Sequence, residues 1–450
     1  MSSTAHRDDA GHENAAQGPD PDRLWTVGEH LADVLAAVHP LEPIELQLLD
    51  AQGCVLVDDV TAAVSLPPFD NSSMDGYAVR VADVAGASEE FPAALEVVGD
   101  VAAGRRDPLT VGPGQAARIM TGAPLPPGAE TVVPVEWTDG GLGEGPVTGM
   151  RARSLAPEGA EGEVLVYRPA EARAHVRAEG SDVRAGERVL EAGTVLGPPQ
   201  IALLAAIGRG RARVRPRPRV VVLSTGSELV QPDEQLAHGQ IFDSNSFSLT
   251  AAARDAGAIA YRVGAVADDA ETLRSTIEDQ LVRADLMVTT GGVSVGAYDV
   301  VKEALEHVAD AEEPGSGVEF RKLAMQPGKP QGFGSIGPDH TPLLALPGNP
   351  VSSYVSFELF VRPAIRALMG LPDPQRPTAT ATLAADEALT SPKGRRQFLR
   401  GWHADGSVRP VGGAGSHLVA ALARANALIV VPEDTESVAP GAEVEVVLLG

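Results

Sequence analysis

Three short segments of the chain combine glycine with hydroxyl side chains, a composition suited to binding an anion. They are STGSE (224–228), TTGGVSVG (289–296) and PGNPVSS (347–353), and each directly follows an apolar run. Glycine lets backbone N–H groups approach a negatively charged ligand closely, and hydroxyl groups add further donors. Taken together, the three loops predict a site for a phosphate-like ligand.

The third loop has the clearest local signal. Asn349 is a good N-cap residue and Pro350 suits the first position of a helix. The free N–H groups of the first helical turn would then face a ligand without any positively charged side chain. Read alone, this loop is equally an ordinary capped helix, and the binding interpretation depends on the presence of the other two loops.

Three acidic residues lie near these loops, namely Glu228, Asp268 and Asp299. Each alone reads as a charge or cap at a helix N-terminus. Together they predict a Mg²⁺ site, because Mg²⁺ takes oxygen ligands and commonly links carboxylates to phosphates. The sequence has no HxxxH or CxxC pattern, so a zinc site is not expected.

Two lysines flank a Gln-Pro-Gly turn. Lys322 and Lys329 would lie near one sheet edge and could neutralise a phosphate or another oxyanion, although solvated surface lysines explain them as well. The turn-rich stretch 68–78 and the stretch 117–124, which ends in Thr121-Gly122, also concentrate polar groups. Their composition alone fits ordinary loops.

The segments that would position these loops alternate between strand-like and helix-like patterns. The run RVVVL (219–223) is typical of a strand buried on both faces. Further strands are expected at 258–266, 285–290, 321–325 and 342–346, with helices at 246–256, 271–283, 299–308 and 350–369. This alternation predicts a doubly wound α/β domain with a parallel sheet. A capping box, Thr26 to Glu29, predicts a helix up to Val38. Residues 92–195 and 378–450 read as β-rich.

Composition excludes several classes of protein. The chain has 450 residues and a net charge of −25, which argues against nucleic-acid binding. It has no run of 18 apolar residues, so no membrane span is expected, and the polar first 22 residues lack a signal-peptide core. One cysteine, Cys54, is consistent with a reducing cytoplasm.

Six motifs, in order, resemble those of the MoeA family, the molybdopterin molybdenumtransferases, which are similar to the E domain of gephyrin. They are DNSSMDGYAVR (70–80), RIMTGAPLP (118–126), STGSEL (224–229), TTGGVSVGAYD (289–299), KLAMQPGKP (322–330) and LPGNPVSS (346–353). The resemblance covers residues 24–450 and leaves outside only residues 1–23, whose polar composition predicts a disordered tail.

The resemblance implies an α/β multidomain fold with four parts. A discontinuous linker domain is built from 24–58 and 188–212, and a β-rich domain spans 59–187. A MogA-like α/β domain that binds molybdopterin covers 213–372, and a β-barrel-like domain covers 373–450.

The resemblance also implies an activity. MoeA-like enzymes use molybdate, adenylylated molybdopterin and Mg²⁺, release AMP and place molybdenum on the dithiolene. A cytoplasmic homodimer is implied, with the active site at the subunit interface, and a molybdopterin adenylyltransferase is a candidate partner. Family catalytic positions map by motif onto Asp75, Thr121, Glu228, Asp268, Asp299 and Lys322. Substrate-binding positions map onto Arg177, Asp182, Gly291, Gly292, Ser294, Lys329, Pro347, Asn349, Pro350, Ser352, Arg400 and Ser416.

One departure from the family pattern affects the substrate site. Many relatives have lysine where this chain has Gln326, and the glutamine keeps hydrogen bonding but removes a charge. Two alternatives remain open at this point: a molybdopterin adenylyltransferase, which would consume ATP, and a non-catalytic scaffold like gephyrin. Retention of Glu228, Asp268 and Asp299 argues against a dead enzyme.

Overall fold

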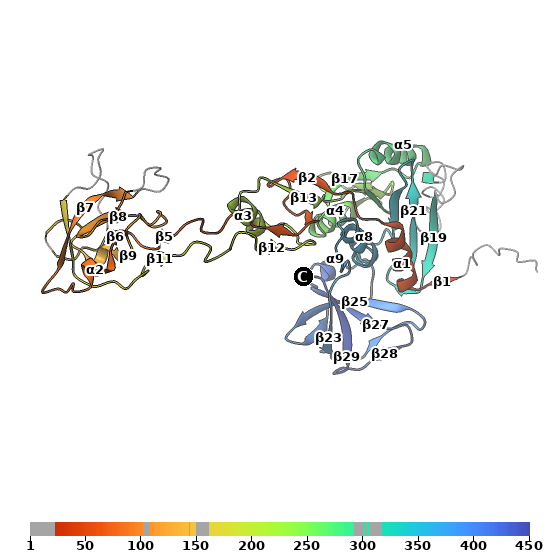
Figure 1. The fold of residues 1–450 in the computed structure, drawn as a ribbon. Helices are drawn as coiled ribbons and strands as arrows, with labels where there is room; N and C mark the ends of the chain where they lie inside the picture. The colour runs from red at the N-terminus through yellow and green to blue at the C-terminus, as the bar shows by residue number, and fades with distance from the viewer. Residues whose placement is uncertain are drawn as a thin grey trace, which may run out of the picture. The chain divides into compact units, whose positions relative to one another are not determined.

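The structure is a computed structural model that divides into two compact units. It describes residues 23–101, 109–143, 145–149, 162–291, 301, 304–305 and 317–450. The first unit comprises the chain up to Ile44, Gly53–Val55 and Arg215–Gly450, and the second comprises Glu45–Gln52 and Leu56–Val214 (Figure 1). Each unit has a main sheet and a hydrophobic core of its own.

A seven-stranded sheet forms the centre of the first unit, in the order β1-β19-β21-β22-β18-β14-β17. Four neighbouring strands are parallel, as the sequence predicts: β17 (Ile259–Val266), β14 (Arg219–Thr225), β18 (Leu286–Thr290) and β22 (Thr341–Leu346). Beyond β22 the sheet is mixed. β21 (Pro330–Ile336) is antiparallel to both β22 and β19 (Gly317–Leu323), and β1 (Leu24–Trp25) is parallel to β19.

The antiparallel strand β21 is a difference from the parallel sheet expected from sequence. Its proline and two glycines weaken a strand pattern. The structure gives the glycines a reason: a Cβ at Gly334 would lie 1.8 Å from the carbonyl oxygen of Gly317, and one at Gly332 would lie 2.9 Å from Ala345. Glycine is therefore required where β21 approaches its neighbours closely.

Helices cover both faces of the sheet, which confirms the doubly wound α/β class. Along β14 the side chains alternate between two cores: Val220 and Val222 pack into one, and Val221 and Leu223 into the other. The first core includes α1 (Val27–Ala37), α4 (Asn245–Asp255), α7 (Pro350–Ser356), the π-helix η2 (Phe357–Val361) and α8 (Arg362–Leu368). The second includes α5 (Ala270–Leu281) and helical residues at 301 and 304–305.

A six-stranded sheet of the C-terminal region has the order β20-β25-β26-β23-β29-β27. Pairing between β25 and β27 closes it, which confirms the barrel-like expectation. Its strands are β20 (Met325–Gln326), β25 (Arg396–Ala404), β26 (Ser407–Pro410), β23 (Thr378–Leu383), β29 (Glu443–Leu448) and β27 (Ala427–Val431). The same region contains a two-stranded sheet of β24 (Leu389–Thr390) and β28 (Ser437–Val438), and the short helix α9 (Val419–Leu422). Because β20 follows directly after the central sheet's β19, it connects the two sheets.

The second unit is β-rich, as predicted. Its main sheet has the order β10 (Gly162–Val166), β7 (Ala93–Val101), β8 (Gln115–Ile119), β6 (Gly76–Val79), β9 (Thr131–Pro134). Smaller sheets pair β5 (Asn71–Ser72) with β11 (Val176–Arg177), β4 (Val60–Thr61) with β12 (Arg188–Leu190), and β13 (Arg211–Arg215) with β2 (Ile44–Gln47) and β3 (Val55–Leu56). Its helices are α2 (Val81–Val84), η1 (Val135–Trp137) and α3 (Pro198–Ala206). Within the described residues, no helix has the length and apolar character needed to cross a bilayer.

The helix α1 begins with the predicted capping box and buries a histidine. Thr26 accepts a hydrogen bond from the Glu29 backbone N–H at 3.1 Å, and the Glu29 carboxylate accepts one from the Thr26 N–H at 2.8 Å. His30 is fully buried in T-shaped contacts with the Phe333 and Phe360 rings, and neither ring nitrogen has a hydrogen-bond partner among the described residues. Burial, reinforced by the positive charge of Arg321, lowers the pKa of His30 to about 4.

The buried imidazole predicts a loss of stability in mild acid. At pH values above the unfolded-state pKa of about 6.5, His30 is neutral in both states, so its protonation does not change the stability. As the pH falls from there towards 4, only the unfolded state gains the proton, so folding weakens by about 3 kcal/mol. Leucine does not titrate, so the His30→Leu variant should not show this loss. The difference in unfolding free energy between variant and parent, measured by urea titration, should therefore shift in favour of the variant by about 3 kcal/mol between pH 7 and pH 4. A pH-independent difference would contradict the assignment.

Candidate functional site

The carboxyl ends of three parallel strands meet on one line of the central sheet. Ser224 of β14 pairs in register with Thr290 of β18, and Thr290 pairs with Leu346 of β22. The loops after these strands therefore start side by side, at the edge where open α/β sheets bind ligands. Gly291 makes the approach possible, because a Cβ there would lie 2.2 Å from the carbonyl oxygen of Thr225 and its φ is +99°.

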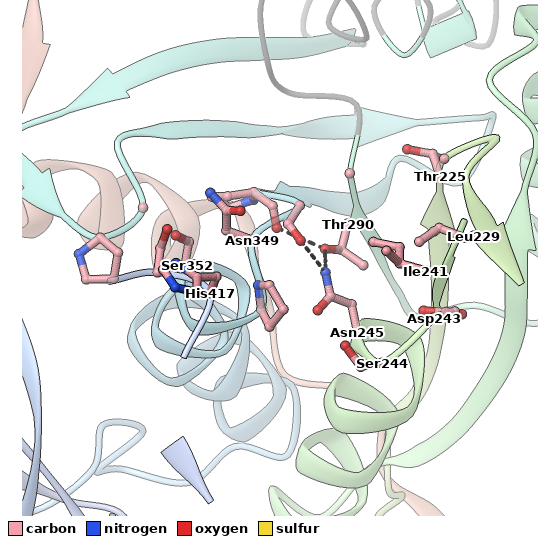
Figure 2. A pocket seen from close by; sticks show the side chains of 18 of the residues that line it. Thr225, Leu229, Ile241, Asp243, Ser244, Asn245, Thr290, Asn349, Ser352 and His417 are labelled. Atoms are coloured by element: carbon pink, nitrogen blue, oxygen red, sulfur yellow. Dashed lines mark hydrogen bonds between the residues drawn. The ribbon is translucent and has the colours of Figure 1, made fainter. Parts of the chain in front are cut away.

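A pocket of about 960 Å³ opens at this edge, within the first unit (Figure 2). All three predicted loops contribute to it, together with a turn of the central sheet and a loop of the C-terminal region. The lining includes Thr225, Gly226, Glu228, Asp268, Gly291, Gln326, Pro347, Asn349, Pro350, Ser352 and Ser416. The structure thus brings together residues that the sequence placed in six separate segments.

Asn245 fixes the second and third loops to each other. Its amide nitrogen donates to Thr290 Oγ1 at 3.1 Å and to the carbonyl oxygen of Gly348 at 2.7 Å (Figure 2). Thr290 in turn donates to the carbonyl oxygen of Pro347 at 3.0 Å. Asn349 is the N-cap residue of α7 and Pro350 is its first residue, as predicted, and Ser352 is buried beneath them. The loop bases are therefore held in place from within the protein.

Two of the predicted metal ligands line the pocket. Glu228 is exposed, and Asp268 is bonded to Ser227: the Ser227 N–H donates to the carboxylate at 3.3 Å, and the Asp268 N–H donates to Ser227 Oγ at 3.2 Å. Asp269, rather than Asp268, caps α5, with its carboxylate accepting from the Thr272 N–H at 2.8 Å. The second carboxylate oxygen of Asp268 is buried and has no hydrogen-bond partner in the part of the chain that the structure describes. This donor set suits Mg²⁺, which binds carboxylate oxygens.

Three predicted residues, Gly292, Ser294 and Asp299, lie outside the described residues. Within the described part of the chain, no three acidic, histidine or cysteine side chains converge as a metal-binding group. The pair Glu228 and Asp268 is therefore the part of the expected metal site that the structure describes.

Asp243 is a pocket residue that the sequence reasoning missed. It is buried at 1% exposure, and its carboxylate accepts from Ser224 Oγ at 2.9 Å, from the Ser246 N–H at 3.1 Å and from the Ser246 hydroxyl. The signal in the sequence was the Asp-Ser-Asn stretch at residues 243–245, where α4 begins, which has the composition of a helix start. Asp243 positions the start of α4 and, through it, Asn245.

The Gln-Pro-Gly turn and the C-terminal loop form the opposite end of the pocket. Gln326, Pro327 and Gly328 line it, whereas Lys322 and Lys329 are not among the lining residues. The lysines do lie near one another, because Lys322 pairs in register with Pro330 between β19 and β21. Ser416 lines the pocket, and its carbonyl oxygen accepts from the Val351 N–H at 3.0 Å, which ties this loop to α7.

Arg400 is buried behind this loop and is not itself among the residues that line the pocket. The side chain is 1% exposed, and one of its terminal nitrogens, Nη2, donates to the carbonyl oxygen of Gly413. Among the described residues, its Nε and Nη1 groups have no hydrogen-bond partner. Burial lowers the pKa of the guanidinium, yet arginine stays protonated in proteins. A buried charge of this kind is costly without an anionic partner.

Four predicted residues lie in the second unit. Asp75 and Thr121 are brought together, since the Thr121 N–H and hydroxyl donate to the Asp75 carboxylate at 2.7 and 2.8 Å. Arg177 lies in β11 opposite Asn71, and the Asp182 N–H donates to the carbonyl oxygen of Leu66 at 3.0 Å. The Asp75–Thr121 contact links two turns that sequence alone could not connect.

The site is a pocket lined by carboxylates and hydroxyls at the strand ends of a doubly wound α/β sheet. Three family models match successive parts of the chain. The MoeA N-terminal region (domain I and II) matches residues 25–208, the probable molybdopterin binding domain matches 221–367, and the MoeA C-terminal region (domain IV) matches 382–449.

Curated relatives match nearly the whole chain. Molybdopterin molybdenumtransferase 2 of Mycobacterium tuberculosis is 46% identical over 94% of this chain and 99% of its own length. Molybdopterin molybdenumtransferase 1 of the same species is 38% identical over 95% of this chain and 99% of its own. The Bacillus subtilis molybdopterin molybdenumtransferase is 34% identical over 88% of this chain and 87% of its own.

Solved structures agree with these relatives. A crystal structure of a MoeA protein from Pyrococcus horikoshii matches with a TM-score of 0.69 and 31% identity, covering 95% of this chain and 100% of that one. A second structure from the same organism matches with a TM-score of 0.66 and 27% identity, over 95% and 100% of the two chains. The chain belongs to the MoeA family, as its motifs predicted.

The bonds of Asp243 predict a structural rather than a catalytic effect of removing it. The Asp243→Ala substitution leaves the Ser224 and Ser246 donors without their acceptor, which should lower the unfolding free energy by about 2–4 kcal/mol. Urea unfolding monitored by circular dichroism measures this. Asp233→Ala, at an exposed position of the preceding loop, should change stability by less than about 0.5 kcal/mol. Equal effects of the two substitutions would contradict the account.

Proposed function

We propose that this protein is a molybdopterin molybdenumtransferase of molybdenum cofactor biosynthesis. It would take adenylylated molybdopterin and molybdate, place molybdenum on the dithiolene and release AMP. The support is threefold: similarity over nearly the full length, at 46% and 38% identity, to relatives with that name; a pocket at the strand ends of the α/β sheet; and polar groups at one end of that pocket with carboxylates suited to a divalent cation at the other.

The buried guanidinium of Arg400 is the observation that carries this proposal. Its Nε and Nη1 groups need acceptors, and it lies behind the loop that contributes Ser416 to the pocket. Molybdate is a dianion whose oxygens accept hydrogen bonds, so it satisfies these donors and compensates their charge. Gln326 adds an amide donor where a lysine would have added a second charge. We place molybdate at this end.

Glu228 and Asp268, with Asp299, would hold Mg²⁺ at the other side of the pocket. The bound ion supplies charge neutralisation for the pyrophosphate of the adenylylated substrate. The protein contributes the free carboxylate oxygen of Asp268, which Ser227 orients, and the exposed carboxylate of Glu228. The loop carrying Asn349 and Ser352, and the turn at 291–296, would cradle the phosphates between the two ends.

We further propose a cytoplasmic homodimer whose active site is completed by the partner subunit. The Asp75–Thr121 pair is exposed and polar, and it lies in the unit that does not contain the pocket. Asp75 and Thr121, with Arg177 and Asp182, would approach the pocket from the other subunit. A molybdopterin adenylyltransferase would supply the substrate.

Incubation with adenylylated molybdopterin, molybdate and Mg²⁺ tests the activity. AMP release that depends on molybdate supports it, and Asp75→Ala should reduce that release while leaving the fold intact. ATP consumption with pyrophosphate release would instead indicate the adenylyltransferase. Failure of the pure protein to turn over any of these substrates would favour the scaffold.

Arg400 allows a sharper prediction for molybdate. Arg400→Met keeps much of the volume but removes the donors and the charge, so the molybdate concentration for half-maximal AMP release should rise about 10- to 100-fold. Arg424→Met changes an exposed arginine of the same region and serves as the control. Unchanged molybdate dependence in Arg400→Met would place the oxyanion elsewhere.

A second prediction concerns the metal. Asp268→Asn removes a charged ligand, so the Mg²⁺ concentration for half-maximal activity should rise by about tenfold or more. Asp269→Asn is the matched neighbour: it weakens the cap of α5 without changing the pocket's carboxylates. A Mg²⁺ titration should therefore separate the two variants. Equal shifts in both would assign the effect to the helix start instead of to metal binding.

A further inference from the structure

The pocket has an apolar rim at the end away from the C-terminal loop. Two short parallel strands, β15 (Leu229–Val230) and β16 (Ile241–Phe242), form it. The Ile241 N–H donates to the carbonyl oxygen of Glu228 at 3.0 Å, and the Asp243 N–H donates to that of Val230 at 2.9 Å. Asp243 directly follows β16, and its buried hydrogen bonds to Ser224 and Ser246 hold this end of the strand in place. The rim is therefore a rigid part of the pocket wall.

Two large apolar side chains of this rim remain exposed in the pocket wall. Ile241 is 55% exposed and Phe242 is 40% exposed, and both line the pocket with Leu229. The protein's own packing does not cover this aromatic surface. A planar heterocyclic ring can stack on it, because stacking needs only a flat face on each partner. The chemistry points to a heterocycle attached to a phosphate.

The position of the rim indicates which heterocycle. In Figure 2, Ile241 and Leu229 lie at one end, Ser352 and His417 at the other, and Asn349 and Thr290 between them. In adenylylated molybdopterin the dithiolene and pterin lie on one side of the pyrophosphate and adenosine on the other. With molybdate and the dithiolene at the end of Gln326 and Ser416, the adenosine reaches the rim beside Glu228 and Asp268.

We propose that Phe242, supported by Ile241, is the platform on which the adenine base stacks. This inference rests on the proposed function, since it uses the substrate named there. The platform binds the leaving nucleotide and helps to hold the pyrophosphate beside Glu228 and Asp268. It makes no contact with molybdate and does not take part in bond breaking.

Calorimetric titration of the full-length protein with AMP and with ribose 5-phosphate tests the platform. The two ligands share a phosphorylated ribose, so the ratio of their affinities reports the contribution of the base. Phe242→Ala should weaken AMP binding about 10- to 100-fold and bring the ratio close to one, with little effect on ribose 5-phosphate. Phe242→Tyr keeps the ring and should keep the parent ratio.

Two controls keep the test decisive. Phe91→Ala removes an exposed phenylalanine of the second unit and should leave both affinities unchanged. Phe242→Leu serves if the alanine variant fails to fold, and should also lower the ratio. Parent-like AMP binding in Phe242→Ala overturns the platform alone, whereas a parent protein that binds no AMP overturns it together with the proposed function.

Discussion

The in-register alignment of β14, β18 and β22 is the constraint on which the site depends. Ser224, Thr290 and Leu346 are neighbours across three strands, so the three loops that follow leave the sheet at one line. A shift of one strand would separate Thr225 from Gly291 and move the third loop away from Asn245. The two hydrophobic cores that fix this register, one on each face, therefore also determine the geometry of the pocket.

The charged and polar groups of the pocket differ in arrangement from the strongly acidic chain as a whole. With a net charge of −25, the protein does not attract anions over long distances. The pocket compensates with backbone donors, with the buried guanidinium of Arg400 behind one end, and with carboxylates suited to a divalent cation at the other. Under the proposed function, separating these two kinds of group would let one pocket accept both molybdate and a pyrophosphate.

Much of the fold was predictable because its signals are local. The apolar run of β14, the capping box at Thr26 and the Asn349-Pro350 helix start each predicted the element that the structure contains. The strand β21 was missed, since its glycines are explained only by contacts with Gly317 and Ala345 that are formed in the folded sheet. Asp243 was missed for the same reason, because its partners are identified by burial and not by spacing. The domain boundaries and the roles of the site residues stay predictions.

A diffraction experiment on crystals soaked in molybdate tests the central claim most directly. Anomalous scattering locates molybdenum independently of any assumed position. We expect an anomalous peak in the pocket, with molybdate oxygens within hydrogen-bond distance of the Nε and Nη1 groups of Arg400 and near Ser416 and Gln326. A molybdate bound elsewhere, with the Arg400 guanidinium still contacting no anion, would contradict the account of how this acidic protein binds its oxyanion.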